Sequence, residues 1–340
     1  MKIEELAKKE KLKVLIIRTD RIGDVVLSTP VLSSIRKAKP GWDISILVRP
    51  LLGELLLGHP DIDRLITLDT NDKPNFSNTA NLHETLRVEK FDIAIHLFSD
   101  FWISLAVYRA GIPLSIGPAS KLGQIFYNFK IKQRRSKGER HETDYNLDLL
   151  APLDIEPVRK SSLPLPEKIS PSALALLDGS RKNIGIFPGM GGSARNWKPE
   201  KYAELADRLS AEGFRIILVA GPGEEQLLDE LLRHSSGKYP KVANLGLKEF
   251  AGFIGKLDLF VAPSTGPLHI STAVGTPAVG IYCPIRVCLP QRWGPIGEKD
   301  IGLVPDVQVC EKCTSDKCRE FDCMDKLDMD TVFKAVMERI

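Results

Sequence analysis

Short apolar runs alternate with amphipathic stretches along most of the chain, and this alternation constrains the fold more than any other feature. KVLIIR is followed by VVLSTPVLSSIRKA and then WDISILVRP, and further on FDIAIHLF precedes FWISLAVYRAG. The short runs are continuously apolar, as in strands covered on both faces, whereas the longer stretches have helical spacing. Strands that alternate with helices in this way predict a parallel sheet wrapped by helices.

A proline-rich segment divides this pattern in two. DIEPVRKSSLPLPEKISPS carries four prolines among charged and serine residues, and we interpret it as an interdomain linker. The alternation restarts after it with NIGIFPG. We predict an α/β chain of two similar, doubly wound domains with parallel sheets, at residues 1–160 and 161–324, with the cleft between them as the expected binding site. The terminal stretch 325–340 has helical spacing and is a candidate to pack on the first domain.

Composition excludes several classes of protein. The 340 residues suffice for two domains, and 47 basic against 44 acidic residues give a net charge of only +3. This balance argues against nucleic-acid binding through a basic face. No apolar run reaches the roughly 18 residues that span a bilayer, and the charged start MKIEELAKKEKLK has no signal-peptide core. We therefore expect a cytoplasmic protein.

The first candidate site follows the first apolar run. In RTDRIGDVVLSTP, Asp24 comes directly after Gly23, where a buried strand is succeeded by a helix. In open α/β sheets this is the carboxyl edge, where ligands bind and a helix N-terminus offers unpaired N–H groups. A carboxylate there either caps the helix or does chemistry.

Two loops of the second domain are typical of phosphate sites. VAPSTGPLHISTAVGTP places the turn of Ser264, Thr265 and Gly266 before a helix, where a glycine lets N–H groups approach a diphosphate. The alternative is a plain helix cap by a hydroxyl. The second loop, in FPGMGGSARNWKPEKYAEL, offers as candidate contacts Gly191, Gly192, Ser193 and Arg195. An arginine there can neutralise a departing phosphate, although glycine-rich loops also serve only as turns.

Two histidines are candidates either for ligand contacts or for packing in the core. His269 lies three residues after Gly266, and its nearness to the predicted phosphate site makes it a candidate donor contact. A lone histidine is more often a packing residue. His96 lies inside the apolar run FDIAIHLF, so we expect it to be buried.

A basic loop, KIKQRRSKGERHET, concentrates positive charge in an otherwise balanced chain. It either meets an anionic acceptor or lipid headgroups, or is a solvated surface loop. The candidate acceptor contacts are Arg21 and Gly23, beside Asp24, and four residues of this loop, Arg134, Arg135, Arg140 and His141.

Four cysteines crowd a short segment near the C-terminus. Cys310, Cys313, Cys318 and Cys323 have the spacing C-x2-C-x4-C-x4-C. Four thiolates at this density could close a tetrahedral, structural zinc site. Disulfides and buried thiols are the alternatives.

Three motifs in order resemble one family. RTDRIGDVVLSTPVLSSIRKAKP, PGMGGSARNWKPEKYAEL and STGPLHISTAVGTPAVGIYCP together are similar to glycosyltransferase family 9, the ADP-heptose:lipopolysaccharide heptosyltransferases. The resemblance implies a GT-B architecture, in which two Rossmann-like domains face a central cleft, the N-terminal one for the acceptor and the C-terminal one for the nucleotide-sugar donor. It also implies inverting transfer of a heptose from ADP-heptose to the lipopolysaccharide inner core, Kdo-lipid A or its heptosylated form, with no catalytic metal.

The resemblance assigns roles to individual residues. The family's Gly-Asp acid corresponds to Asp24, which would be the general base that deprotonates the acceptor hydroxyl. The donor-phosphate contact of the glycine-rich loop corresponds to Arg195, and the family's Thr-Gly turn to Thr265 and Gly266. Many members have Asp before that turn, where this chain has Ser264, a neutral side chain with less acceptor capacity.

Alternatives to this function remain. An enzyme with another nucleotide-sugar donor or acceptor would have the same fold and the same base. Ser264, in place of the usual Asp, leaves the identity of the donor undecided. A nucleotide-sugar epimerase is disfavoured because it has no acceptor to deprotonate. A non-catalytic nucleotide-sugar-binding module would have no use for Asp24. We expect peripheral association with the inner face of the inner membrane, supported by the basic loop and the amphipathic N-terminus, and no nucleic-acid partner.

Overall fold

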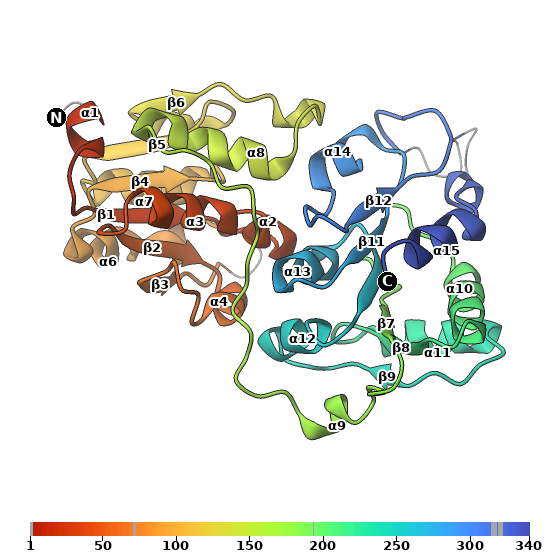
Figure 1. Ribbon diagram of the computed structural model, residues 1–340. Helices are drawn as coiled ribbons and strands as arrows, with labels where there is room; N and C mark the ends of the chain where they lie inside the picture. The colour runs from red at the N-terminus through yellow and green to blue at the C-terminus, as the bar shows by residue number, and fades with distance from the viewer. Residues whose placement is uncertain (1–2, 71–72, 193, 314–317, 319–321) are drawn as a thin grey trace. The chain divides into compact units, whose positions relative to one another are not determined.

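The chain folds into two compact α/β units. The computed structural model describes residues 3–70, 73–192, 194–313, 318 and 322–340 (Figure 1). The first unit comprises Met1–Arg135 and Glu142–Pro164, and the second Ser136–His141 and Leu165–Ile340. In the described part of the chain, no helix is long and apolar enough to cross a membrane.

A six-stranded sheet with only parallel pairings forms the centre of the first unit. Its strand order is β3-β2-β1-β4-β5-β6, and Val14 of β1 lies opposite Ile44 of β2 on one side and Ile93 of β4 on the other. The strands are β1 (Lys13–Ile17), β2 (Asp43–Val48), β3 (Arg64–Thr67), β4 (Ile93–His96), β5 (Leu114–Pro118) and β6 (Phe129–Ile131). The order reverses between β1 and β4, and open α/β sheets bind ligands at such a switch point.

Helices cover both faces of this sheet, which explains why β1 is apolar and buried from Val14 to Ile17. Helices α6 and α7 pack on one another and share a core cluster with Leu15 and Ile17, whereas α3 contacts α8. The helices are α1 (Ile3–Ala7), α2 (Ile22–Val26), α3 (Thr29–Ala38), α4 (Pro50–Leu56), α5 (Phe76–Thr79), α6 (Leu82–Glu89), α7 (Phe101–Arg109) and α8 (Glu142–Leu147), with the 3-10 segments η1 (Leu122–Phe126), η2 (Arg135–Lys137) and η3 (Asp148–Leu153).

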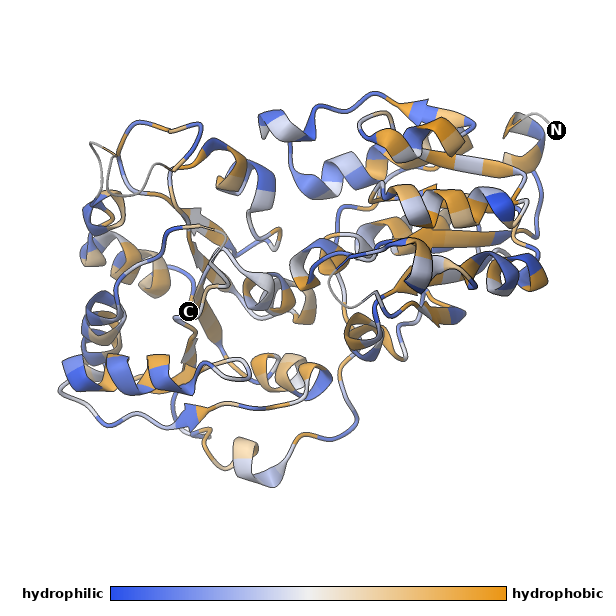
Figure 2. Ribbon diagram, turned by 180° about the vertical axis from the view of Figure 1, so that it is seen from behind, coloured by the Kyte–Doolittle hydropathy of each residue, from blue (hydrophilic) through white to orange (hydrophobic). Residues whose placement is uncertain are grey.

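The second unit repeats the topology of the first. Its sheet has the order β12-β11-β10-β7-β8-β9, again with parallel pairings, so the chain order reverses between β7 and β10. The strands are β7 (Asn183–Ile186), β8 (Arg215–Val219), β9 (Lys241–Val242), β10 (Leu259–Pro263), β11 (Ala278–Ile281) and β12 (Ile301–Leu303). Figure 2 shows hydrophobic strands at the centre of each unit and helices of mixed hydropathy around them.

The helices of the second unit also form two layers. Helix α10 packs against α11 and α15, and α12 packs against α13. The segments are α9 (Pro171–Leu174), α10 (Pro199–Ala211), α11 (Glu225–His234), α12 (Leu247–Ile254), α13 (Gly266–Val274), α14 (Pro290–Trp293), α15 (Met329–Met337), η4 (Arg286–Cys288) and η6 (Cys323–Lys326).

The predicted fold class, two doubly wound Rossmann-like domains with parallel sheets, is confirmed. The expectation that the C-terminal helix packs on the first domain is wrong. Val332 and Val336 of α15 are completely buried in the core of the second unit, because the apolar face of α15 is complementary to α10. Residues 136–141 also belong to the second unit, although they precede the linker.

Candidate active site

Asp24 lies at the switch point of the first sheet. It follows β1 by seven positions and occupies the first turn of the short helix α2, whose N-cap residue is Arg21. The Asp24 carboxylate does not cap that helix: it accepts a hydrogen bond from the Arg18 guanidinium instead. The structure therefore shows an ion pair with Arg18 in place of a helix cap, and a catalytic role for Asp24 stays a prediction.

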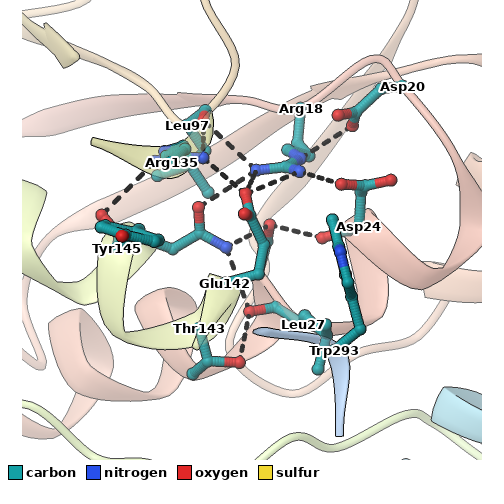
Figure 3. Close-up of polar contacts among 12 residues, drawn as sticks. Arg18, Asp20, Asp24, Leu27, Leu97, Arg135, Glu142, Thr143, Tyr145 and Trp293 are labelled. Carbon is teal, nitrogen blue, oxygen red and sulfur yellow. Dashed lines mark hydrogen bonds and ion pairs between the residues drawn. The ribbon is translucent and has the colours of Figure 1, made fainter. Parts of the chain in front are cut away.

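Arg18 organises the polar groups around Asp24 (Figure 3). Its side chain is only 1% exposed, and its Nε donates to Asp20 at 2.7 Å. Nη1 donates to Asn146 at 3.0 Å and to the carbonyl oxygen of Leu97 at 3.2 Å. Both Nη atoms lie 3.3 Å from Oε1 of Glu142. The guanidinium therefore connects three parts of the chain: the segment after β1, the segment after β4, and helix α8.

Two further carboxyl groups lie close to Asp24. Asp20, Asp24 and Glu142 share two guanidinium groups, those of Arg18 and Arg135, because Arg135 Nη1 donates to Glu142 at 2.5 Å. The negative charges of Asp20 and Glu142 therefore lie close to the Asp24 carboxyl group. A buried group in such surroundings holds its proton to a higher pH than a solvated one.

The pKa of Asp24 reflects its burial and these neighbouring charges. Burial and the negative charge of Asp20 raise the pKa of Asp24 to about 7, against the opposing effect of Arg18. The side chain keeps 15% of its surface exposed, so a ligand can reach the carboxylate. A base is most efficient when its pKa lies near the working pH, because it is then ionised and still basic.

Helix α8 contacts both Arg18 and the end of α2. Glu142 and Asn146 are four residues apart, so they project from the same face of α8 towards Arg18. Asn146 Nδ2 and the Thr143 hydroxyl both donate to the carbonyl oxygen of Leu27, each at 3.2 Å. The end of α2 is thereby tied to α8, which positions the helix that carries Asp24.

Two loops leave the second sheet at its switch point. The loop after β7 contains Gly191, Gly192 and Arg195, and the turn after β10 leads into α13. Because β7 and β10 are hydrogen-bonded neighbours, both loops leave the sheet from adjacent strands at its carboxyl edge. Gly192 has φ +70°, a left-handed conformation that favours glycine. Ser193 lies outside the described residues.

The turn before α13 has the geometry of an anion site. Thr265 is the N-cap residue of α13 and its side chain makes no capping hydrogen bond, so the plain-cap alternative is not realised by Thr265. Gly266 is the first helical residue and Pro267 occupies the first turn, as is favourable at helix starts. The N–H groups of such a start attract a phosphate. The backbone N–H of Ser264 donates to the carbonyl oxygen of Ile281 at 3.0 Å, which fixes the start of the turn.

His269 is buried in the first half of α13. Burial lowers its pKa to about 3, so the ring is neutral. In the described part of the chain its Nδ1 has no hydrogen-bond partner. His96 is buried as expected, and Ser115 lies 3.0 Å from its Nε2.

The basic loop is more structured than a solvated loop. Arg135 contacts Glu142 and the carbonyl oxygen of Leu97, and buried His141 lies 2.9 Å from the carbonyl oxygen of Gly294. These two predicted acceptor contacts are therefore engaged within their own units. Arg134 and Arg140 are exposed, as is Arg21 beside the half-buried Gly23, so a ligand can reach them.

The cysteines gather around one cavity. All six belong to the described residues and none forms a disulfide. A cavity of about 300 Å³ is lined by Arg195 and by five of them, Cys283, Cys310, Cys313, Cys318 and Cys323. Arg195 Nε donates to Cys313 Sγ at 3.2 Å. Among the described residues no group of three or more His, Cys, Asp or Glu side chains is placed to hold a metal ion. The zinc site stays a prediction.

Sequence reasoning missed Arg18, Glu142 and Asn146. Arg18 had a signal, since a charged residue directly after a fully apolar strand must find partners within the fold. Glu142 and Asn146 had none, because more than 120 residues separate them from Arg18.

Comparison with known proteins identifies relatives of this chain. The model of glycosyltransferase family 9 (heptosyltransferase) matches residues 79–323. A protein of Haemophilus influenzae whose name gives only the class glycosyltransferase is 33% identical over 309 residues, 85% of this chain and 87% of that protein. The lipopolysaccharide core heptosyltransferase OpsX of the same organism is 26% identical over 282 residues, 80% of each.

A solved structure extends the likeness to the whole fold. The structure of E. coli ADP-heptose lps heptosyltransferase II superimposes with a TM-score of 0.78 at 19% identity, over 96% of this chain and 98% of that one. This likeness bears out the predicted GT-B fold class. With the family model covering most of its length, the chain belongs to glycosyltransferase family 9 and is a glycosyltransferase of the lipopolysaccharide heptosyltransferase type.

Proposed function

We propose that this glycosyltransferase moves a heptose from ADP-heptose to the Kdo or heptose of a lipopolysaccharide inner core, with inversion and with Asp24 as the general base. The observation that carries the proposal is the Asp24 carboxyl at the switch point, partly exposed, with a pKa raised to about 7. It suits a reaction in which a sugar hydroxyl, a poor nucleophile at neutral pH, must lose a proton as it attacks.

The proposed step is a single displacement. The acceptor hydroxyl transfers its proton to Asp24 while its oxygen attacks the anomeric carbon of the donor. The bond between that carbon and the phosphate oxygen breaks on the opposite side, and ADP leaves with the electron pair. Positioned general-base catalysis of this kind contributes roughly 10²- to 10⁴-fold.

The second unit supplies the donor groups in this proposal. The N–H groups at the start of α13 and the guanidinium of Arg195 would stabilise the charge that develops on the departing diphosphate. His269 Nδ1 is buried and has no hydrogen-bond partner in the described part of the chain, so its role in the donor site stays a prediction. The relatives named for heptosyl transfer support ADP-heptose as donor. Ser264, a neutral residue directly before the turn, is the residue that bears on a different donor sugar.

Calorimetry tests the donor directly. The purified protein is titrated with ADP, UDP and GDP, and then with ADP-heptose. Selective binding of ADP and ADP-heptose supports the proposal. A preference for another nucleotide would retain the base but change the donor. Binding of a nucleotide sugar without any transfer to deacylated inner-core acceptors would favour the non-catalytic binding module.

A further inference from the structure

Arg135 lies in the polar network of the candidate active site and reaches it through Glu142 (Figure 3). Its Nη1 donates to Glu142 Oε1 at 2.5 Å and to the carbonyl oxygen of Leu97 at 3.1 Å, an oxygen that also accepts from Arg18. Its Nη2 donates to the carbonyl oxygen of Tyr145 at 3.4 Å. The side chain is 14% exposed. These contacts fix the guanidinium within the first unit.

Glu142 lies closer to Arg135 than to Arg18. Its Oε1 is 2.5 Å from Arg135 Nη1 but 3.3 Å from both Nη atoms of Arg18. The Glu142 side chain is only 2% exposed, and a carboxylate buried to this extent needs a cation close by. Because Arg135 provides the closer contact, Nη2 of Arg18 remains hydrogen-bonded to Asp24.

The ion pair between Arg135 and Glu142 also joins the two points where the chain leaves and re-enters the first unit. Residues 136–141, which lie between them, belong to the second unit. Within that unit His141 is buried, and its Nε2 lies 2.9 Å from the carbonyl oxygen of Gly294. The second unit therefore holds the segment itself, whereas the ion pair holds its two ends together.

We infer that Arg135 is a positioning residue for Asp24: it holds Glu142 away from Arg18, so that the Arg18 guanidinium stays on the Asp24 carboxylate. The inference deepens the proposed function, since it assumes that Asp24 is the base. It gives Arg135 a role inside the first unit in place of the contact with the acceptor that its basic loop suggested.

The inference predicts shifts of opposite sign for the two partners. The charged groups that face Asp24 are Arg18 and Asp20 from the segment after β1 and Glu142 from α8, with Arg135 beyond Glu142. Glu142→Gln removes a negative charge and should lower the pKa of Asp24. Arg135→Gln should raise this pKa, because Glu142 then pairs more closely with Arg18 and competes with Asp24. A substitution that only weakened the fold would not give shifts of opposite sign.

The pH dependence of kcat/KM tests these shifts. We expect the midpoint to move upward by about half a pH unit in Arg135→Gln, which is roughly threefold in kcat/KM at pH 6, and downward by about as much in Glu142→Gln. The double variant Arg135→Gln/Glu142→Gln should have a midpoint near that of the unchanged protein. Arg135→Lys retains the charge but not the planar fork, so it should move the midpoint upward by less than Arg135→Gln does.

A second ion pair of α8 provides matched controls. Arg159 Nε lies 2.8 Å from Asp144 Oδ1, and both side chains are more exposed than those of Arg135 and Glu142. Arg159→Gln and Asp144→Asn change the same charges on the same helix and should leave the midpoint where it is.

A substrate-free measurement separates this inference from the proposed function. The pKa of Asp24 is followed by ¹³C NMR of its carboxyl carbon, whose signal is assigned from its absence in Asp24→Asn. Opposite shifts in Arg135→Gln and Glu142→Gln support the positioning of this carboxyl group even if no heptose is transferred. Shifts of the same sign, or none beyond those of the controls, overturn the inference even if transfer is confirmed. If Arg135→Gln does not fold, Arg135→Lys takes its place, and the absence of an upward shift overturns the inference.

Discussion

The pKa of Asp24 predicts how turnover depends on pH. If Asp24 is the base, only its ionised form accepts the acceptor proton, and its pKa is raised to about 7 by burial and by Asp20. Between pH 8 and pH 6 the ionised fraction falls from about nine-tenths to about one-tenth, so kcat/KM, which reports the pKa of the ligand-free protein, should fall roughly tenfold. An aspartate with an ordinary pKa of about 3.9 would stay ionised across this range, and the rate would not change.

The measurement is the rate of ADP release, followed by chromatography at each pH over a range of substrate concentrations, so that both kcat/KM and kcat are obtained. The variant Asp24→Asn should lose about 10²- to 10⁴-fold in kcat while it retains ADP affinity, because the carboxylate is not part of the donor site. Its residual rate should show no step near pH 7. Transfer that survives in Asp24→Asn, or a flat profile in the unchanged protein, would refute the assignment of the base.

A stability measurement checks the same pKa without substrates. Because the pKa of Asp24 is higher in the folded chain than in the unfolded one, the folded state binds the proton more tightly between these two values. The free energy of unfolding of the unchanged protein, relative to Asp24→Asn, should therefore decrease as the pH rises from about 4 to 7, by about 1.4 kcal/mol per pH unit. A relative free energy that does not vary with pH would contradict a raised pKa, whatever the kinetics show.

Three further substitutions test the arrangement of the two sites. Arg18→Gln leaves buried Glu142 with one fewer cationic partner. The free energy of unfolding, measured by urea denaturation, should therefore decrease by about 3–5 kcal/mol. A decrease under about 1 kcal/mol would show that the network contributes little to stability. Arg195→Ala should weaken ADP binding or turnover, measured by calorimetry and ADP release, and unchanged values for both would remove it from the donor site. Trp197→Ala should lower the free energy of unfolding by about 3–5 kcal/mol, because the indole is buried. The indole also donates to the carbonyl oxygen of Leu327 and so joins the segment after β7 to the C-terminal segment. An unchanged melting temperature would contradict this prediction.

The strand–helix alternation was enough to predict both sheets, because period and apolar continuity are local properties. The same reasoning placed Asp24 and the turn at Thr265 where strands end, and the structure has both at switch points. The sequence pattern could not predict which element packs against the apolar face of a given helix. The amphipathic face of α15 would suit either unit, and only the shape and apolar surface of α10 selected the second.

What the sequence by itself determined is the pair of repeated α/β units, the position of an acidic residue after β1 and the family motifs. The tertiary structure alone decided that Arg18 binds Asp24, that Glu142 and Asn146 reach it from α8, and that five cysteines line one cavity. The physical reason is distance along the chain. Patterns of period and turn residues report neighbours within one element, whereas burial and charge balance depend on groups that meet only after the sheet and its helices have packed.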